Sequence, residues 1–482
     1  MHDVCHRQLR RLLALWLACV MVLHVAAQRR EVHILAANDM HATLEYMPQL
    51  AAITDSLRAL YPSLLVLSGG DNRTGNPLSD MYEPSSYPMV ALMNQIGFNA
   101  STLGNHEFDM HSLPEVIPHS NFRYICANIF ADSLSGVSTV PYQVFDVDGL
   151  KVGIVGAVQV GESGTPSTHP DNLRGITFCR AHDVLGRYEW LSRQCDATVL
   201  LSHLGYQTDI EMAQLFPWFD LIVGGHTHTQ LRADEPLHNG VLITQNKNKL
   251  RNVTHITLTV DSGRVVDKRA EYIAVRTYPK KQKLVETMVA HFSDNPAFQR
   301  VVARLEEPFE TTEEIGCMIC DAYISEGHAD IGIQNTGGVR IESMPKGNIT
   351  VFDVLKMDPF YNVAVELMLT GEEVRELLLS YSQFIRYRVP YVRGLRCELL
   401  PDPNDAYRVA DIRLLTTDGQ PLDMQRVYRV VTNNYISATT PSLRPDQMQV
   451  MNTETADMIM HFLEKRGTVN YRGVRCHVVR GE

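Results

Sequence analysis

Short apolar runs alternate with longer polar or amphipathic segments over the first half of the chain, from Glu31 to about Val275. The runs are rich in aliphatic and β-branched residues, and the segments between them are compatible with helices or loops. This alternation is typical of an α/β domain whose strands are buried between helical layers. The runs read VHILAAN, LLVLSGG, NASTLGN, KVGIVGAV, TVLLSHLG, LIVGGH and VLITQN.

The pattern changes after a charged, helix-like connector at residues 281–306. The remainder of the chain combines helices, a glycine turn (QNTGGVR) and strands in a different order, which we interpret as a second, α+β domain. A length of 482 residues also favours more than one hydrophobic core. Helices are expected near residues 312–327, near 350–356 and at GEEVRELLLSYS, with strands at AVELML, near 391–399 and near 427–434.

The first 27 residues have the pattern of a signal peptide. Three arginines precede the apolar stretch Leu12–Ala27, and the small residues before Gln28 fit a cleavage site. The stretch is short for a membrane span, although an uncleaved anchor is an alternative. We therefore expect an exported protein, periplasmic or secreted, without a membrane span after cleavage. The expected division is a signal peptide at 1–27, a first domain at 28–280, a connector at 281–306 and a second domain at 307–482.

The net charge argues against a nucleic-acid duplex as a partner. The formal charge is −11 at pH 7, and residues 1–27 carry three Arg and one Asp, so their removal gives −13 (−11 − 2). An acidic protein does not attract a polyanion through its net field. A small anionic substrate is compatible with this charge, because a local metal ion or arginine cluster can outweigh it. The sequence does not indicate an oligomeric state.

The cysteines do not suggest a disulfide framework. Nine cysteines minus the two of the signal peptide leave seven, an odd number at scattered spacings. Cys317 and Cys320 form a C-x-x-C pair within a helix-like stretch that has no tight turn, so we expect neither redox chemistry nor a zinc site there.

Five of the apolar runs in the first half end abruptly in Asp, Asn or His. In α/β sheets, ligands bind beyond the carboxyl ends of the strands, where loops can converge. Glycines at 69, 70, 104, 224 and 225 allow the backbone to turn sharply and to approach a central object. The strand-end residues are Asp39, His41, Asp71, Asn105, His106, His203, His226 and His228.

These residue types indicate a site for divalent metal ions. Carboxylate, amide and imidazole ligands without cysteine suit Mn²⁺, Zn²⁺, Co²⁺ or Mg²⁺. The groups are too many for one ion and about right for two, and Asp71, alone on its loop, is the natural bridging ligand. Two ions about 3.5–4 Å apart can clamp a phosphoryl group and generate hydroxide at neutral pH. The sequence therefore predicts a two-metal site.

The motifs DMH, GGDN, GNHEFD, SHLG and GGHTH, in this order, resemble those of the calcineurin-like metallophosphoesterases, and the second domain narrows the resemblance to the exported 5′-nucleotidase family. The resemblance implies a four-layer α/β/β/α metallophosphoesterase domain followed by a smaller α+β substrate-binding domain. It also implies that His106 and Asp109 form a catalytic dyad. The implied ligands are Asp39, His41, Asp71 and His228 for one ion, and Asp71, Asn105, His203 and His226 for the other.

The second domain carries the implied substrate-binding residues. Asn335 and Arg340 belong to a turn that resembles the family pattern N-x-G-G-[IV]-R, and a guanidinium suits phosphate oxygens. Phe360 and Tyr435 match two aromatic residues that sandwich the base in the family. One segment departs from the family, because residues 437–448 (SATTPSLRPDQM) lack the usual glycines. An arginine that the family often has before the first helix of this domain is also missing, with Thr311 near its place.

The implied activity is release of phosphate from nucleoside 5′-monophosphates, by in-line attack of a metal-bound hydroxide on phosphorus. Cleavage of nucleotide-sugar pyrophosphates is a further activity to consider. The unusual segment 437–448 keeps a second substrate class open, in which the enzyme is a 2′,3′-cyclic-nucleotide 2′-phosphodiesterase and 3′-nucleotidase. A non-catalytic nucleotide-binding or adhesion protein with this fold is an alternative of a different class, although it would have little use for the dyad.

Overall fold

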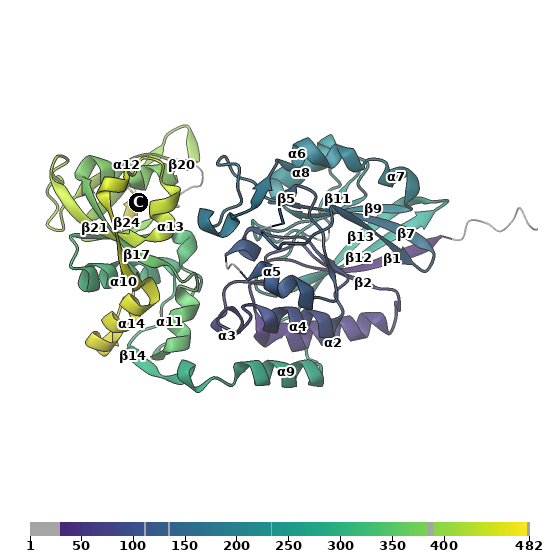
Figure 1. The fold of residues 1–482 in the computed structure, drawn as a ribbon, viewed down its shortest axis with the longest axis horizontal. Coiled ribbons are helices and arrows are strands. Elements are labelled where there is room, and N and C mark those ends of the chain that lie inside the picture. Colours follow the sequence, from purple (N-terminus) through teal and green to yellow (C-terminus); the bar gives the residue numbers. More distant parts are fainter. Residues whose placement is uncertain (1–28, 110–111, 134, 233, 383–388, 480–482) are drawn as a thin grey trace, which may run out of the picture.

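The chain folds into two lobes in a computed structural model that describes residues 29–479 apart from 110–111, 134, 233 and 383–388. The predicted signal peptide lies outside the described residues. Figure 1 shows the first lobe in purple to teal and the second in green to yellow, with α9 (Lys283–Ser293) running below the first lobe toward the second. Among the described residues, no helix is both long enough and apolar enough to cross a membrane.

Two sheets form the centre of the first lobe. The first has the order β13-β12-β1-β2-β3-β4, and the second has the order β11-β10-β9-β7-β6. Strands β1 to β4 run parallel, as do β7, β9, β10 and β11. The first sheet comprises β1 (Arg30–Ala37), β2 (Leu65–Ser68), β3 (Ala100–Ser101), β4 (Arg123–Tyr124), β12 (Asn252–Asp261) and β13 (Arg264–Ala274). The second comprises β6 (Tyr142–Val147), β7 (Leu150–Val158), β9 (Ala197–His203), β10 (Leu221–Val223) and β11 (Leu242–Thr244).

Alternate side chains of β1 show why the lobe has four layers. Val32 and Ile34 pack toward the second sheet, with Ile154 and Val199 in the same core. Leu35 points the other way, into a core with the helices α2 and α4. On the far side of the second sheet, residues such as Leu200 pack against α6 to α8. The helices are α2 (Met47–Arg58), α3 (Pro77–Asp80), α4 (Tyr87–Ile96), α5 (Leu113–Val116), α6 (Ala181–Val184), α7 (Leu191–Gln194) and α8 (Tyr206–Leu215).

The expected four-layer α/β/β/α domain is thus confirmed, and all seven apolar runs contain strands. The antiparallel hairpin of β12 and β13 was not among them. Most residues of β13 are half-buried or exposed, so they leave no apolar run in the sequence. A small sheet of β5 (Ile129–Ala131) and β8 (Ile176–Phe178) completes the lobe.

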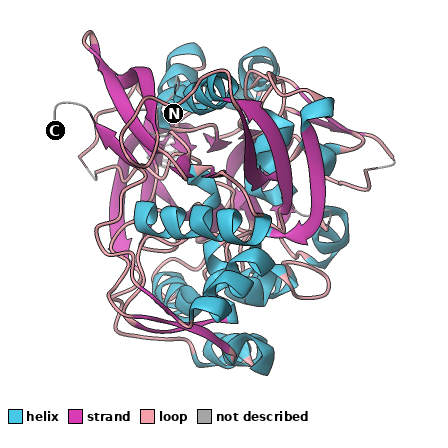
Figure 2. Cartoon of the chain, turned by 90° about the vertical axis from the view of Figure 1, so that its left-hand side faces the viewer, coloured by secondary structure: helices cyan, strands magenta, loops and turns pink. Residues whose placement is uncertain are grey.

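The second lobe is α+β, as expected, with a central sheet of order β18-β15-β21-β17-β22. Figure 2 looks onto this lobe, in which helices and strands both occur. Two three-stranded sheets, β16-β14-β23 and β20-β19-β24, lie outside the central one. The helices are α10 (Thr312–Gly327), α11 (Val351–Met357), α12 (Gly371–Ser382), α13 (Asn434–Thr439) and α14 (Thr455–Arg466). The strands are β14 (Val301–Leu305), β15 (Ile331–Gln334), β16 (Gly347–Thr350), β17 (Val363–Thr370), β18 (Tyr391–Arg393), β19 (Arg396–Asp402), β20 (Asp405–Leu415), β21 (Val427–Asn433), β22 (Met448–Glu454), β23 (Thr468–Val469) and β24 (His477–Val479).

The connector is helical over only part of its length. Helix α9 ends at Ser293, and residues 301–305 form strand β14, which pairs with β16. Pro296 explains the end of the helix, because proline disfavours helical conformation in the preceding residue, Asn295. The interpretation of the whole segment 281–306 as helix-like was therefore wrong for its last residues.

Thr311 has a local role that explains its identity. Its hydroxyl accepts a hydrogen bond from Glu314 N, and the Glu314 carboxylate accepts one from Thr311 N, which together form a capping box at the start of α10. Where the family often has an arginine, this chain therefore has a helix cap.

The structure contains one disulfide that the spacing of the cysteines did not suggest. Cys317 of α10 is bonded to Cys476, with a Cα–Cα distance of 5.8 Å. The partners are 159 residues apart in sequence, so spacing could not pair them. Cys320, the second cysteine of the C-x-x-C pair, is a buried free thiol whose Sγ donates to Tyr391 O at 3.3 Å.

Candidate metal centre

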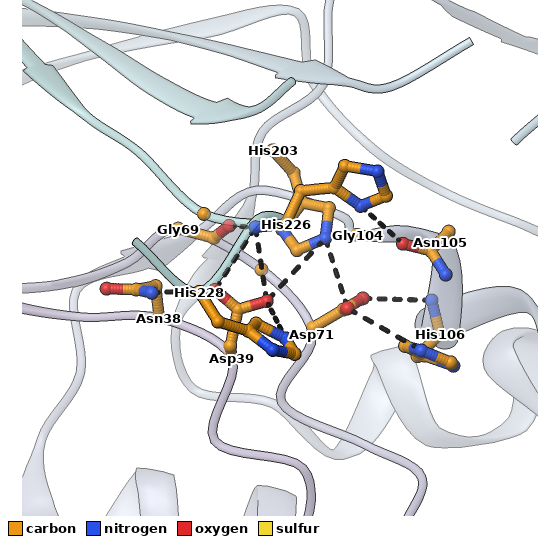
Figure 3. A network of polar contacts seen from close by, with 12 residues as sticks. Asn38, Asp39, Gly69, Asp71, Gly104, Asn105, His106, His203, His226 and His228 are labelled. Carbon is orange, nitrogen blue, oxygen red and sulfur yellow. Dashed lines mark hydrogen bonds and ion pairs between the residues drawn. The ribbon is translucent and has the colours of Figure 1, made fainter. Parts of the chain in front are cut away.

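The strand-end residues of the two sheets meet at one edge of the first lobe (Figure 3). Asp39, Asp71 and Asn105 follow the adjacent parallel strands β1, β2 and β3. His203 ends β9, and His226 follows its parallel neighbour β10. Because parallel strands end at the same edge, side chains far apart in sequence converge there.

The distances bring all seven predicted metal ligands together. His228 Nε2 lies 3.3 Å from Asp39 Oδ1 and 3.2 Å from His41 Nε2. His226 Nδ1 lies 3.0 Å from Asn105 Oδ1. Within the described part of the chain, the groups of three ionisable residues that could hold an ion are Asp39, His41 and His228, then Asp39, Asp71 and His203, then His41, Asp71 and His106.

Asp71 lies between the two predicted ion sets, as expected of the predicted bridging ligand. Its Oδ2 lies 3.1 Å from His203 Nε2 and 4.0 Å from His41 Nε2, and these two histidines belong to different predicted ion sets. Its Oδ1 accepts a hydrogen bond of 2.9 Å from His106 N, which fixes the carboxylate plane. One oxygen of Asp71 therefore faces both halves of the site.

The site holds buried negative charge. Asp39 and Asp71 are 0% and 2% exposed. Burial raises the pKa of each carboxyl, but neighbouring histidines outweigh it: His228 and His203 lower the pKa of Asp39, and His203 and His106 hold the pKa of Asp71 well below its usual range. Two ionised carboxylates in a protein interior need cationic partners. This charge and the facing imidazoles fit divalent cations.

Hydrogen bonds to the backbone select the nitrogen that two imidazoles present. His203 Nδ1 lies 2.7 Å from Gly69 O, and His41 Nδ1 lies 3.2 Å from Thr74 O. A ring whose Nδ1–H donates to a carbonyl keeps Nε2 free for a metal ion. Burial, with a smaller contribution from Arg340, holds the pKa of His41 well below its usual value, so this ring is neutral, as a ligand must be.

The backbone of the site is strained at five of the predicted ligands. Asp39, His41, Asp71, His226 and His228 all have positive φ, between 46° and 77°. Non-glycine residues rarely adopt this conformation, at a cost of about 1–3 kcal/mol each, and such residues cluster at functional sites. Close packing adds a second constraint, because a Cβ at position 104 would lie 2.1 Å from Asp71 Oδ1.

The predicted dyad is assembled beside the ligands. His106 Nδ1 lies 2.5 Å from Asp109 Oδ2, and His106 Nε2 lies 3.9 Å from Asp71 Oδ2. Burial lowers the pKa of His106, but the carboxylates of Asp109 and Asp71 raise it further, so its pKa stands above the usual value. The ring is thereby favoured as a proton donor near neutral pH.

Two buried charged residues that the sequence did not single out support these loops. The Glu107 carboxylate is fully buried and accepts hydrogen bonds from Asp71 N, Asn72 N and Gly104 N at 2.6–2.9 Å. Arg73, 1% exposed, donates to Glu107 O and to two serine hydroxyls. Arg73 lies in the stretch GGDNRTG and Glu107 in the motif GNHEFD. Neither residue belongs to a periodic pattern from which its burial could have been predicted.

The second lobe places an arginine against this site. Arg340 Nη2 lies 3.2 Å from His41 Nδ1, and its Cζ lies 5.6 Å from the ring centroid of Phe360. The Phe360 ring is stacked on His106, with centroids 5.9 Å apart. Two contacts hold the lobes in this arrangement, because Lys249 Nζ donates to Arg340 O and Arg251 pairs with Glu342.

The other two predicted substrate residues lie on the second lobe as well. Tyr435 is half-buried on α13, and burial, with the charges of Tyr381 and Asp109, raises its pKa to about 12. Asn335 is bonded within its own lobe, where its Oδ1 accepts from Asn433 Nδ2 at 2.9 Å. The structure therefore brings Arg340 and Phe360 to the site and gives Asn335 a role in holding the glycine turn, whereas the role of Tyr435 stays a prediction.

Comparison with protein families agrees with this geometry. The family described as calcineurin-like phosphoesterase matches residues 32–230, and the family described as 5′-nucleotidase, C-terminal domain matches residues 289–440. The chain thus combines a region that matches the calcineurin-like phosphoesterases with a region that matches the C-terminal domain of 5′-nucleotidases, as the resemblance implied. The prediction of a metallophosphoesterase that acts as a hydrolase is confirmed, and the match to the calcineurin-like phosphoesterases implies divalent metal ions, for which the structure has candidate ligand groups.

Relatives in this family align over most of the chain. A 5′-nucleotidase of Vibrio cholerae is 28% identical over 72% of this chain and 74% of its own length. Protein UshA of Yersinia enterocolitica is 25% identical over 84% of this chain and 85% of its own. The trifunctional nucleotide phosphoesterase protein YfkN of Bacillus subtilis is 23% identical over 84% of this chain, which corresponds to 32% of that longer protein.

Solved structures share the fold. A 5′-nucleotidase precursor from Thermus thermophilus superposes with a TM-score of 0.81 at 24% identity, covering 94% of this chain and 100% of that one. The sulfate thiohydrolase SoxB of the same genus has a TM-score of 0.77 at 19% identity, covering 94% and 97%. The fold of the family thus also supports chemistry on a substrate other than a nucleotide.

Proposed function

We propose that this chain is an exported two-metal phosphohydrolase that releases phosphate from nucleoside 5′-monophosphates. The observation that carries the proposal is the position of Arg340, whose guanidinium reaches a predicted metal ligand, His41, from the other lobe. A phosphate at the metal ligands would meet this cationic fork, while the rest of the nucleotide extends along the second lobe. The sequence of residues 1–27 supports the cellular location, and a structural neighbour is named as a precursor.

The site residues divide into two ligand sets. Divalent ions bound there would neutralise phosphate oxygens and supply a nucleophilic water at neutral pH. The oxygen and nitrogen ligands suit Mn²⁺, Zn²⁺, Co²⁺ or Mg²⁺. One ion would be held by Asp39, His41, Asp71 and His228, and the other by Asp71, Asn105, His203 and His226.

The remaining residues bind the substrate and move its proton. Arg340 binds the phosphate through its planar fork. Asp109 holds His106 by Nδ1, which leaves Nε2 facing the site to protonate the leaving oxygen. Phe360, stacked on His106, and Tyr435 provide aromatic surface for a base. The same attack at phosphorus would cleave nucleotide-sugar pyrophosphates, the second substrate class that we propose.

A second candidate is favoured by the segment after Tyr435. In place of the glycines usual in the family, α13 continues to Thr439, and Tyr381 Oη lies 2.7 Å from Thr439 Oγ1. These hydrogen-bonded side chains would give the proposed nucleoside pocket a shape different from the one that glycines allow in the family. YfkN, a related protein, is named as trifunctional. A 2′,3′-cyclic-nucleotide phosphodiesterase with 3′-nucleotidase activity is therefore the alternative.

Phosphate release by residues 28–482 tests the two candidates. Metal-stripped protein would receive Mn²⁺, Co²⁺, Zn²⁺ or Mg²⁺ in turn, with AMP, 3′-AMP, 2′,3′-cyclic AMP or UDP-glucose as substrate and an added phosphatase where the first product keeps its phosphate. Metal-dependent release from AMP is expected. Activity confined to the cyclic and 3′ substrates would favour the alternative, and no release from any of the four would overturn both. N-terminal sequencing of the protein released from cells checks export, which predicts a start at Gln28.

Replacing Arg340 by methionine is expected to lower kcat/KM for AMP by about 10- to 150-fold, since a hydrogen bond to a charged group contributes about 1.5–3 kcal/mol. Most of the loss should appear in KM, because the guanidinium contacts the phosphate in the bound state as well as in the transition state. Steady-state kinetics with the metal content measured in parallel would show this. Arg232→Met, at an exposed position, is the matched control.

A further inference from the structure

We propose that Thr168 is a positioning residue, which orients the catalytic dyad from a loop that also orients the metal ligand Asn105. The proposal rests on the proposed function, since it concerns the same site. The loop comes after β7, and the part of it that contacts the site, residues 167–172, is called the orienting segment. Three hydrogen bonds define its roles.

The first bond fixes the amide of Asn105. Asn105 Nδ2 donates to Ser167 O at 3.0 Å. Since an amide carries its donor and its acceptor on opposite sides, this bond turns Oδ1 toward His226, whose Nδ1 lies 3.0 Å away. Figure 3 shows the side chains of Asn105 and His226 directed toward each other. The orienting segment thus determines that Asn105 presents oxygen to the metal side.

The second and third bonds fix Asp109. Thr168 Oγ1 donates to Asp109 Oδ1 at 2.9 Å, on the opposite oxygen from the one that holds His106. Asn172 Nδ2 donates to Asp109 O at 2.8 Å, which anchors the backbone of the same residue. With one oxygen on Thr168 and the other on His106, the carboxylate has a single orientation, and this orientation sets the plane of the imidazole.

Burial distinguishes Thr168 from the outer part of its loop. Thr168 is 5% exposed, whereas Glu162, Ser163 and Gly164 of the same loop are exposed. The loop therefore enters the interior at a residue whose hydroxyl bonds to the dyad. Without this hydroxyl, Asp109 Oδ1 would lose its donor, and the carboxylate could rotate away from His106.

Kinetics of Thr168→Val, Thr168→Ser and Thr165→Val test the proposal. Thr165 is the matched control, because it lies on the same loop and its hydroxyl lies 2.9 Å from Ser163 Oγ instead of contacting the site. Thr168→Val is expected to lower kcat for AMP by about 10- to 150-fold, the range for a lost hydrogen bond to a charged group. KM and metal content should change by less than about twofold, because the substrate and ion ligands remain. Thr168→Ser should restore kcat to within about threefold of the original.

Equal kcat values for Thr168→Val and Thr165→Val would overturn the proposal. So would a loss of bound metal in proportion to the loss of kcat, since Thr168 would then act on the metal site as a whole. A measurement that does not need substrate separates this result from failure of the proposed function. The downfield proton resonance of the His106 Nδ1–H, assigned by its loss in His106→Ala, should weaken or shift in Thr168→Val and persist in Thr168→Ser. An unchanged resonance in Thr168→Val would also overturn the proposal, whichever substrate the enzyme takes.

Discussion

Asp71→Asn is expected to lower kcat/KM by more than about 1,000-fold and to reduce the bound metal, because a single oxygen of Asp71 faces the histidines of both ion sets. The asparagine oxygen could still accept the bond from His106 N, so the loop should keep its shape. The bridging negative charge would be absent, however, and an amide NH₂ would face His203. The substitution should therefore weaken metal binding more than it destabilises the fold.

Two measurements separate these consequences. Metal content by elemental analysis should fall in the variant, and the rise in Tm that metal addition gives the original protein should be lost, since a ligand stabilises only a folded state that binds it. Asp80→Asn is the matched control, because Asp80 is also buried and accepts two backbone N–H groups away from the ligands. Full metal content in Asp71→Asn together with full activity would contradict the proposed role of Asp71 as a metal ligand.

The convergence of the candidate ligands could be predicted from sequence, because it follows from the sheet topology. Each of Asp39, Asp71 and His203 follows or ends an apolar run, and parallel strands end at a common edge whatever their order in the sheet. A pattern that identifies strands thus also identifies neighbours in space. The four layers have the same origin, since runs buried on both faces need helices on one side and a second sheet or more helices on the other.

The residues that support the ligands could not be predicted in this way. Glu107 binds three backbone N–H groups whose convergence depends on the path of two loops, and Thr168 reaches Asp109 from a loop that is 59 residues further along the chain. No periodicity encodes such contacts, because they depend on irregular backbone. The pairing of Cys317 with Cys476 could not be predicted for the same reason. Strand β13 was missed because its mostly exposed or half-buried residues form no apolar run.

The second lobe was predictable in its elements more than in its contacts. Helix α10 begins and ends where the sequence indicated, and its capping box explains the start. The approach of Arg340 to His41 depends on how the two lobes are placed, which the pattern of one chain segment cannot give. The prediction that Arg340 binds substrate came from the resemblance to a family. The structure adds a reason, because it places the guanidinium next to a predicted metal ligand.

His106→Ala is expected to lower kcat by about 100- to 10,000-fold, the contribution of a positioned general acid, while the protein keeps its metal. The ring lies 2.5 Å from Asp109 and its pKa stands above the usual value, as a proton donor requires. The geometry also permits a different role, because His106, with His41 and Asp71, forms one of the sets that could hold an ion. Activity alone would not distinguish a lost acid from a lost ligand.

Metal content and a leaving-group series decide between the two roles. If His106 is the acid, the variant should bind as much metal as the original protein, and its activity should depend more steeply on leaving-group pKa, since phenolates of low pKa depart without a proton. Asp109→Asn should show a smaller loss with the same pattern, because it disturbs the orientation of the ring rather than removing it. His182→Ala, at an exposed position beside Glu211, is the control and should behave as the original protein. Loss of metal with an unchanged leaving-group dependence would instead make His106 a ligand.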